Sequence, residues 1–320
     1  MGLSMASRIT WRTGTALLAF AMLGACGDDR QAVLLITDAG NRRIVQMDDA
    51  SGGGWTTFAY PTTNKSFLSP VAVAVDSQGR IYASNFADNT LSRMDDISGR
   101  GFVTFGRGGR GVGELAAPFG IAVDAQDRLY VADSDNGRIV RMNGIDGMGW
   151  TTLGRPGAGE RAFDSPADVA FDARGRMYVA DRGNGRIVRV DDMSGAGWTT
   201  YGRKGRLGAG EFDLLGGIAV ASDGRIYVTD VNENVVISVA DMTGADYDHF
   251  GYVGNNSLFK QPTGVWVDGA SPIYVASQNN DHVDRFDDIH GTGFQSFGRH
   301  GSGERELDQP LDVVVARIPR

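Results

Sequence analysis

The chain has 320 residues, a net charge of −8 and a single cysteine. The acidic balance argues against a surface that binds nucleic acid, and a lone cysteine excludes an internal disulfide. After about residue 25 the hydrophobic pattern has no helical period, so the bulk of the chain is predicted to be β-structure.

The first 25 residues have the pattern of an export signal. Arg8 and Arg12 precede a short apolar run over residues 16–23, and small residues follow this run. Such a segment is typical of a secretory signal peptide and is too short to span a bilayer. We therefore expect residues 1–25 to be the signal peptide, residues 26–31 to form a short tether and residues 32–320 to form one folded domain.

The end of this segment, Leu23-Gly24-Ala25-Cys26, resembles a bacterial lipobox. The resemblance implies that Cys26 is the lipid-modified first residue of the mature chain and that the protein is anchored in the bacterial cell envelope. An ordinary signal peptide with an incidental cysteine is the alternative. Whether the anchor lies in the inner or the outer membrane stays open. Gly27 follows the cysteine, which favours the outer membrane, but the acidic residues Asp28 and Asp29 come directly after Gly27.

From residue 32 onward the chain repeats one unit six times. An aromatic residue returns at the same phase of every unit, at intervals of 47 to 49 residues. These aromatic residues are Trp55, Phe102, Trp150, Trp198, Tyr247 and Phe294. A period of about 40 to 50 residues with four short strands is typical of a β-propeller blade. The predicted fold is therefore all-β, with six four-stranded blades.

The third unit shows the expected order of strands a to d. Strand a is expected at residues 121–124, strand b at 128–133, strand c at 138–142 and strand d at 149–153. Each run is rich in β-branched and aromatic residues and is bounded by Gly, Asn or Asp, as strands and tight turns are.

The two ends of the repeat region are out of phase. The mature chain starts on a strand b at residues 33–38, and it ends after a lone strand a at residues 312–316. The C-terminal strand a is therefore predicted to pair with the N-terminal strands b to d. This pairing would close the ring and leave no blade with an unpaired edge.

Two of the units resemble the NHL repeat. The resemblance rests on residues 118–124, 129–133 and 136–139, and on residues 177–181 and 184–187 of the next unit. Three units keep an Asp-x-x-Asn-x-Arg signature after strand b, namely Asp38/Asn41/Arg43, Asp133/Asn136/Arg138 and Asp181/Asn184/Arg186. We interpret the signature as structural, with the Asp and the Arg tying strand b to strand c. Such a motif identifies a fold and leaves the function open.

Charged residues differ between the two faces predicted for the ring. The d-to-a and b-to-c connections share one face, called here the top face, and the other connections form the bottom face. The arginines that open the top-face loops are Arg107, Arg155, Arg203 and Arg299. The acidic pairs of the bottom face begin at Asp48, Asp95, Asp191 and Asp287. The top face is predicted to attract anionic partners, unless Glu114, Glu160, Glu211 and Glu304 neutralise its arginines.

Four residues break the repeat near the predicted central channel. Asp168 and Asp312 replace a small residue of strand a three blades apart, so they are expected to face each other across the channel. Trp266 stands where four other blades have alanine, and Tyr252 lies in an atypical d-to-a loop. These residues are candidates for a ligand site at the channel mouth; variation in packing is the alternative.

Enzymes on similar propellers provide a comparison. Gluconolactonases and paraoxonases resemble this ring but gather metal ligands around the channel, where this chain has Val71, Phe119, Ala167, Gly216, Thr263 and Leu311. No catalytic residue, metal ligand or cofactor is assigned. The predicted function is a non-enzymatic scaffold that binds an unknown protein or an anionic envelope ligand through its top face. A metal-dependent hydrolase or lyase that uses Asp168 and Asp312 is the alternative.

Overall fold

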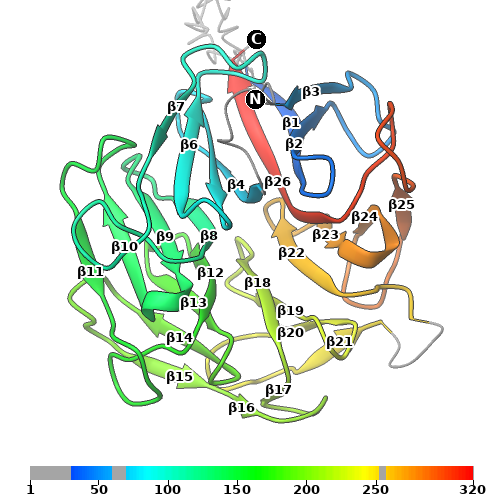
Figure 1. The fold of residues 1–320 in the computed structure, drawn as a ribbon. Coiled ribbons are helices and arrows are strands. Elements are labelled where there is room, and N and C mark those ends of the chain that lie inside the picture. The colour runs from blue at the N-terminus through cyan, green and yellow to red at the C-terminus, as the bar shows by residue number, and fades with distance from the viewer. Residues whose placement is uncertain (1–29, 60–69, 252–256, 320) are drawn as a thin grey trace, which may run out of the picture.

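The computed structural model describes residues 30–59, 70–251 and 257–319. Within these residues the chain forms a ring of six four-stranded antiparallel sheets, which confirms the six-bladed all-β propeller (Figure 1). The expected signal peptide, Cys26 and Tyr252 lie outside the described residues. None of the helices in the described ranges has the length and apolar character that a membrane span needs.

Each blade runs from strand a at the centre of the ring to strand d at its rim (Figure 1). Blade 1 contains β26 (Pro310–Pro319), β1 (Arg30–Asp38), β2 (Arg43–Met47) and β3 (Thr56–Ala59). Blade 2 contains β4 (Pro70–Val75), β5 (Ile81–Asn85), β6 (Thr90–Met94) and β7 (Val103–Phe105). Blade 3 contains β8 (Pro118–Val123), β9 (Leu129–Asp133), β10 (Arg138–Met142) and β11 (Thr151–Leu153).

The second half of the ring has the same order. Blade 4 contains β12 (Pro166–Phe171), β13 (Met177–Asp181), β14 (Arg186–Val190) and β15 (Thr199–Tyr201). Blade 5 contains β18 (Leu215–Val220), β19 (Ile226–Asp230), β20 (Val235–Val239) and β21 (Asp248–Phe250). Blade 6 contains β22 (Pro262–Val267), β23 (Ile273–Ser277), β24 (His282–Phe286) and β25 (Gln295–Phe297). Short 3-10 turns, η1 (Ser134–Asn136) and η2 (Gln278–Asn280), follow β9 and β23.

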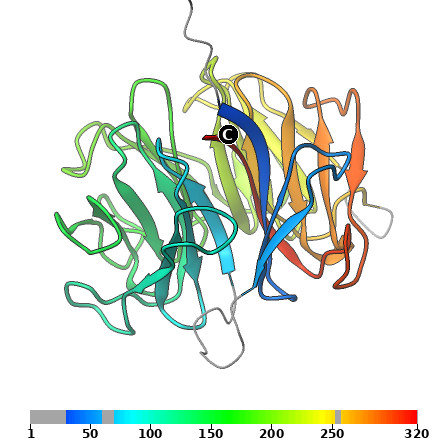
Figure 2. The ribbon, with the colours of Figure 1, turned by 90° about the horizontal axis from the view of Figure 1, so that it is seen from above.

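The strand β26 closes the ring by pairing antiparallel with β1, as predicted. The register joins Ile36 to Val313, and it extends to a pair between Arg30 and Pro319. The pairing is therefore longer than expected, because β1 begins inside the expected tether and β26 continues past residue 316. The start of β1 and the end of β26 lie together on the bottom face of the ring (Figure 2).

The apolar core lies between neighbouring blades. At the closure, Ile36 and Val45 of blade 1 pack with Ala276 and Val283 of blade 6. All four side chains are buried, and full burial of a large aliphatic side chain contributes about 1.5 to 3 kcal/mol. The contact between first and last blades is therefore built like the contacts between blades that are adjacent in sequence.

The aromatic residue that marks each repeat reports one of these contacts between blades. In four blades its ring lies against an aromatic ring of the preceding blade, with centroids 5.5 to 6.2 Å apart. The pairs are Trp55–Phe297, Phe102–Phe58, Trp150–Phe105 and Phe294–Phe250. The period read from the sequence is thus the period of a recurring packing contact.

The top-face loops share a common form. Between blades 4 and 5, β16 (Arg203–Lys204) and β17 (Glu211–Phe212) form a short parallel pair within one loop. Three other loops have a single parallel bridge instead, at Gly108–Leu115, Pro156–Phe163 and His300–Leu307. These bridges fold each loop back on itself above the entry to the next blade.

Candidate functional site

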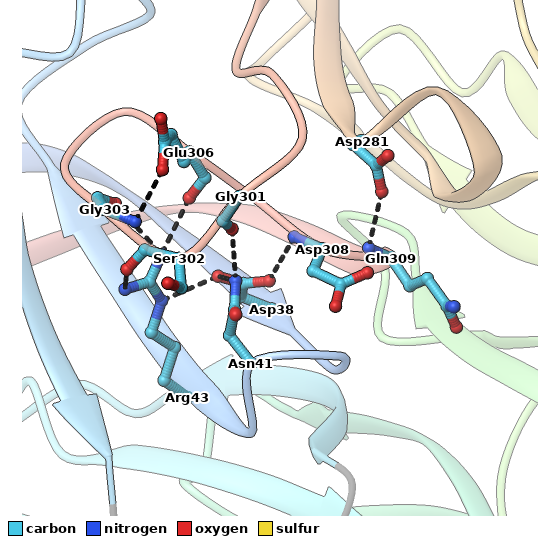
Figure 3. A network of polar contacts seen from close by, with 10 residues as sticks. All are labelled: Asp38, Asn41, Arg43, Asp281, Gly301, Ser302, Gly303, Glu306, Asp308 and Gln309. Carbon is cyan, nitrogen blue, oxygen red and sulfur yellow. Dashed lines mark hydrogen bonds and ion pairs between the residues drawn. The ribbon is translucent and has the colours of Figure 1, made fainter.

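The Asp-x-x-Asn-x-Arg signature holds the top-face loop that enters its own blade (Figure 3). In blade 1 the Asp38 carboxylate accepts hydrogen bonds from Asn41 Nδ2 at 2.9 Å and from Arg43 Nε at 2.7 Å. The Arg43 guanidinium also donates to the backbone carbonyls of Ser302 and Glu306, both at 2.7 Å. The signature ties strand b to strand c, as interpreted, and in addition it clamps the entering loop.

Blades 3 and 4 repeat this arrangement. Arg138 Nε lies 2.7 Å from Asp133, and the same guanidinium donates to two carbonyls of the loop at 2.8 Å. Arg186 and Asp181 make the equivalent pair at 2.7 Å. Burial raises the pKa of Asp133 and Asp181, while these hydrogen bonds act in the opposite direction. The buried carboxylates thus depend on their arginines for compensation.

Blade 5 departs from the signature, because it carries an acidic residue where blades 1, 3 and 4 have asparagine, and it lacks the arginine. Glu233 stands at the position of the asparagine and Val235 at the position of the arginine. The buried Glu233 forms an ion pair with Arg206 of the entering loop, with 3.3 Å between Oε1 and Nε. The arginine of this contact therefore comes from the loop, whereas in blades 1, 3 and 4 it comes from the blade.

Three of the four predicted top-face arginines form ion pairs within their own loops. The pairs are Arg107–Glu114, Arg203–Glu211 and Arg299–Glu306. In the last loop the partner is Glu306 and not Glu304, the residue considered from the sequence. Among the residues that the structure describes, Arg155 has no ion pair.

These ion pairs leave the arginines accessible. The Arg107 side chain is 77% exposed, whereas that of Glu114 is 24% exposed. Glu114 also accepts hydrogen bonds from the backbone amides of Gly111 at 2.8 Å and Arg110 at 3.0 Å. These amides and Arg107 lower the pKa of Glu114. Because an arginine has five N–H donors, Arg107 keeps donors that a ligand can use.

Asp168 and Asp312 lie on β12 and β26, on opposite sides of the ring, and they line one cavity. The Asp168 carboxylate accepts from the amide of the next residue at 2.8 Å and from the amide of Ile218 on β18 at 2.9 Å. Asp312 accepts from the amide of the next residue and from that of Val73 on β4, both at 2.9 Å. Each carboxylate therefore joins its own strand a to strand a of the following blade.

Burial dominates the electrostatics of this pair. Burial, together with the negative charge of Asp312, raises the pKa of Asp168 to about 8, and burial raises that of Asp312 to about 7. A Cβ atom on Gly120 or Gly264 would collide with Asp168 or Asp312, respectively. The glycines that precede the two carboxylates around the ring thus provide their space.

Arg182 is a neighbour of Asp168 that sequence reasoning missed. Its guanidinium carbon lies 4.5 Å from the ring centre of Phe119, and its Nε donates to the carbonyl of Leu215 at 2.8 Å. Burial lowers the pKa of Arg182, and Asp168 opposes that shift. The available signal was that Arg182 occupies the place of Ser134 in the preceding blade, whose hydroxyl also bonds to a carbonyl of the next blade.

The cavity that Asp168 and Asp312 line has a volume of about 450 Å³. Its rim includes the exposed residues Ser77, Ala125 and Arg317 of the bottom face, so it opens there. At the top end, the space between the strands a shrinks to about 10 Å³. Trp266 also lines the cavity, whereas the top-face arginines do not. The structure thus brings Trp266 together with the two carboxylates and leaves the four arginines on separate loops.

A second group of possible metal ligands lies on the top face between blades 6 and 1. Oxygen or nitrogen atoms of Asp281, His300 and Asp308 all lie within 4.8 Å of one another. His300 Nδ1 is 3.0 Å from Asp281. The other Asp281 oxygen accepts from the amide of Gln309 at 2.9 Å (Figure 3). Asp281 already bonds to His300 and to the backbone of the loop, so we assign no metal to this group.

Comparison with known proteins supports the fold. The NHL repeat model matches residues 115–142 and 163–189, and no curated protein matches the chain. A chain from a nidogen–laminin complex is similar, with a TM-score of 0.66 and 17% identity over 89% of this chain and 98% of that chain. A streptogramin B lyase has a TM-score of 0.58 and 16% identity over 86% of this chain and 81% of its own.

A virginiamycin B lyase from Staphylococcus aureus, in a catalytically inactive form with quinupristin, has a TM-score of 0.55 and 14% identity. That match covers 85% of each chain. Identities this low show a common fold, and a common fold hosts different functions. The chain described here is therefore a six-bladed β-propeller that contains NHL repeats.

Proposed function

We propose that this protein is a non-enzymatic binding scaffold that is lipid-anchored through Cys26 in the bacterial cell envelope. Its ligand is a protein or an anionic envelope component, and it binds through the top face. The observation that carries this proposal is the position of Arg30, which begins β1 and lines the bottom mouth of the central cavity.

The position of Arg30 sets how an anchored ring would lie on a membrane. Cys26 precedes Arg30 by four residues, and four residues span at most about 14 Å when fully extended. A lipid on Cys26 would therefore hold the bottom face close to the bilayer. The top face, on the other side of the ring (Figure 2), would point away from the membrane toward soluble partners.

The exposed arginines on the top face support an anionic partner. Arg107, Arg203 and Arg299 each have side chains at least 75% exposed. Exposed ion pairs are worth only about 0 to 1 kcal/mol, so the loop glutamates are weak competitors for a partner that brings several anionic groups. Bidentate contacts from arginine to carboxylate or phosphate would supply the affinity.

The alternative, a metal-dependent hydrolase or lyase at the channel mouth, has less support. Both oxygens of Asp168 and of Asp312 accept backbone amides, and one oxygen of each carboxylate makes the contact with the next blade. The top end of the channel narrows around residues such as Val71 and Leu311. A substrate approaching from the top face would therefore not reach the two carboxylates.

The proposal can be tested with matched arginine variants. Residues 30–319 contain every described strand of the closed ring, so a soluble chain starting at residue 27 is suitable. One variant replaces Arg107, Arg155, Arg203 and Arg299 with glutamine. Its control replaces the bottom-face arginines Arg100, Arg174, Arg225 and Arg317 in the same way. Both are immobilised and used to capture partners from envelope extract over a series of salt concentrations.

We expect the wild type and the bottom-face variant to retain the same partner with the same salt dependence. The top-face variant should lose at least about tenfold in affinity, because several charge-assisted contacts would be removed. Equal capture by all three proteins, or loss with the bottom-face variant alone, would overturn binding through the top face. Globomycin-sensitive processing and palmitate labelling that disappears in Cys26→Ser would test the anchor separately.

A further inference from the structure

The central cavity has the size and walls of a small-molecule site. Its volume of about 450 Å³ lies within the range of about 300 to 1,000 Å³ found for ligand pockets. Its sides are the apolar residues of the six strands a, including Val75, Val123 and Phe171. The cavity is nearly closed at its top end and accessible from the bottom face, so a ligand would enter opposite the arginine loops.

One side of the cavity wall differs from the others. The strands a of four blades have an alanine at one position, Ala74, Ala122, Ala170 and Ala219. At this position β22 has Trp266, which is half-buried. The indole Nε1 is itself buried and has no hydrogen-bond partner among the described residues, so what Trp266 offers a ligand is the apolar surface of its ring.

The inner end of the cavity is acidic. Asp168 and Asp312 each accept two backbone amides, but an ionised carboxylate offers about four acceptor positions. Further donors can therefore approach both groups from the cavity. Arg182 faces Asp168 from the side of Phe119, and within the described residues Asp312 is held by the amides of Val73 and Val313.

We propose that this cavity binds a small organic cation, with an apolar body that packs against Trp266 and an ammonium group directed toward Asp168 and Asp312. The apolar wall can pack against the apolar body of such a molecule. A metal ion such as calcium needs several oxygen ligands, and the apolar wall does not supply them. An ammonium group between the two carboxylates relieves the repulsion between them.

The raised pKa values of the two aspartates fit this occupant. Without a cation, burial and mutual repulsion favour protonation of the pair. A bound ammonium group favours the ionised form of the two carboxylates. Binding of the cation should therefore release protons from Asp168 and Asp312. This inference does not depend on the proposed function, because the cavity opens on the face opposite the partner-binding loops.

The experiment compares three probes that share one apolar body: phenylbutylammonium, phenylbutanol and phenylbutyrate. Binding to the soluble chain from residue 27 is measured by calorimetry and by fluorescence of Trp266, with Trp266→Phe identifying its signal. We expect the cation to bind at least about tenfold more tightly than the neutral alcohol, as a charge-assisted contact implies. The anion should bind most weakly.

Two variants locate the site. The double variant Asp168→Asn with Asp312→Asn should bind the cation no more tightly than the alcohol. It should still bind the alcohol, because the apolar wall that holds the phenylbutyl body is unchanged. Ala170→Leu narrows the cavity and leaves both carboxylates, so it should weaken both probes together by at least about tenfold. Val112→Leu, on an exposed top-face residue, is its control. Circular dichroism melts identify any variant that fails to fold.

Three results would overturn the proposal. The first is equal or tighter binding of the alcohol than of the cation to the wild type. The second is the absence of binding by any probe up to millimolar concentration. The third is displacement of the probe by calcium chloride, which would assign the carboxylates to a metal ion. If Asp168→Asn with Asp312→Asn does not fold, retained probe binding by Ala170→Leu would by itself contradict the site.

Discussion

The Asp168 carboxylate on β12 accepts a hydrogen bond from the amide of Ile218 on β18 at 2.9 Å, so one blade holds the inner strand of the next. Other junctions use hydroxyl groups for this purpose. Thr37 donates to the carbonyl of Val71 at 3.0 Å, and Thr229 donates to that of Thr263 at 2.6 Å. The ring is therefore fastened near its axis by polar contacts between blades as well as by the apolar core.

Closure of the ring by β26 should dominate its stability. Removing residues 310–320 would take away every pairing between β26 and β1, together with the buried Val313 and Val314. We expect this truncated chain to show no cooperative unfolding transition in urea. A finer test is Val313→Ala, which should cost about 2 kcal/mol in free energy of unfolding.

The control for Val313→Ala is Val112→Ala, at a residue that is 76% exposed. It should change the free energy of unfolding by less than about 0.5 kcal/mol. Equal effects of the two substitutions, or a truncated chain that melts at the temperature of the full one, would contradict closure through β26.

The NHL signature makes a second prediction about stability. Arg138→Gln removes the guanidinium from the buried Asp133 carboxylate and from two loop carbonyls. Loss of one partner of a buried ion pair should cost about 3 kcal/mol. The matched substitution Arg107→Gln breaks an exposed pair and should cost less than about 1 kcal/mol. Urea unfolding of both variants measures the difference, and similar costs would show that the signature does not clamp the loop.

The repeat made much of this fold predictable. Six copies of the unit, together with the phases of its two ends, predicted the number of blades and the closure between β1 and β26. The Asp–Arg tie was also predictable, since Asp38 and Arg43 are close in sequence and face each other across one hairpin. These features depend on contacts within a repeat or on how often it recurs.

Contacts between blades were harder to predict. Asp168 was expected near the channel, but its bond to Ile218 depends on how two blades are placed relative to each other. The pair between Arg206 and Glu233 joins a loop to the blade after it, and no pattern in one repeat indicates it. The opening of the cavity on the bottom face likewise depends on which side chains fill the top end of the channel.

A glycine in the b-to-c turn provides a third prediction. Gly137 has a φ of 60°, and a Cβ atom there would lie 2.7 Å from the Cα atom of Pro156 in the adjoining loop. Gly137→Ala should therefore cost about 2 kcal/mol or more through strain and collision. Gly159→Ala is the control, because no atom lies within 4 Å of the added Cβ, and its effect should stay within about 0.5 kcal/mol. Thermal melts that rank the two variants equally would contradict the close packing of turn and loop.

The pKa of Asp168 gives a prediction with a definite sign. The pKa is about 8 in the folded chain against an ordinary value of 3.8, so the folded state binds this proton more tightly than the unfolded state. Its contribution to stability is fully present below about pH 4 and is lost as the pH rises toward 8. Asp168→Asn does not titrate, so the free energy of unfolding of the variant should rise relative to that of the wild type between pH 5 and pH 8.

The control is Asp96→Asn, at an exposed turn where hydrogen bonds from Ser98 lower the pKa of Asp96. The stability of this variant relative to the wild type should show no such trend over this range. Arg182 and Asp312 are the charged groups that act on Asp168, and a difference that stays constant or falls with pH would mean that Arg182 keeps Asp168 ionised in the folded ring.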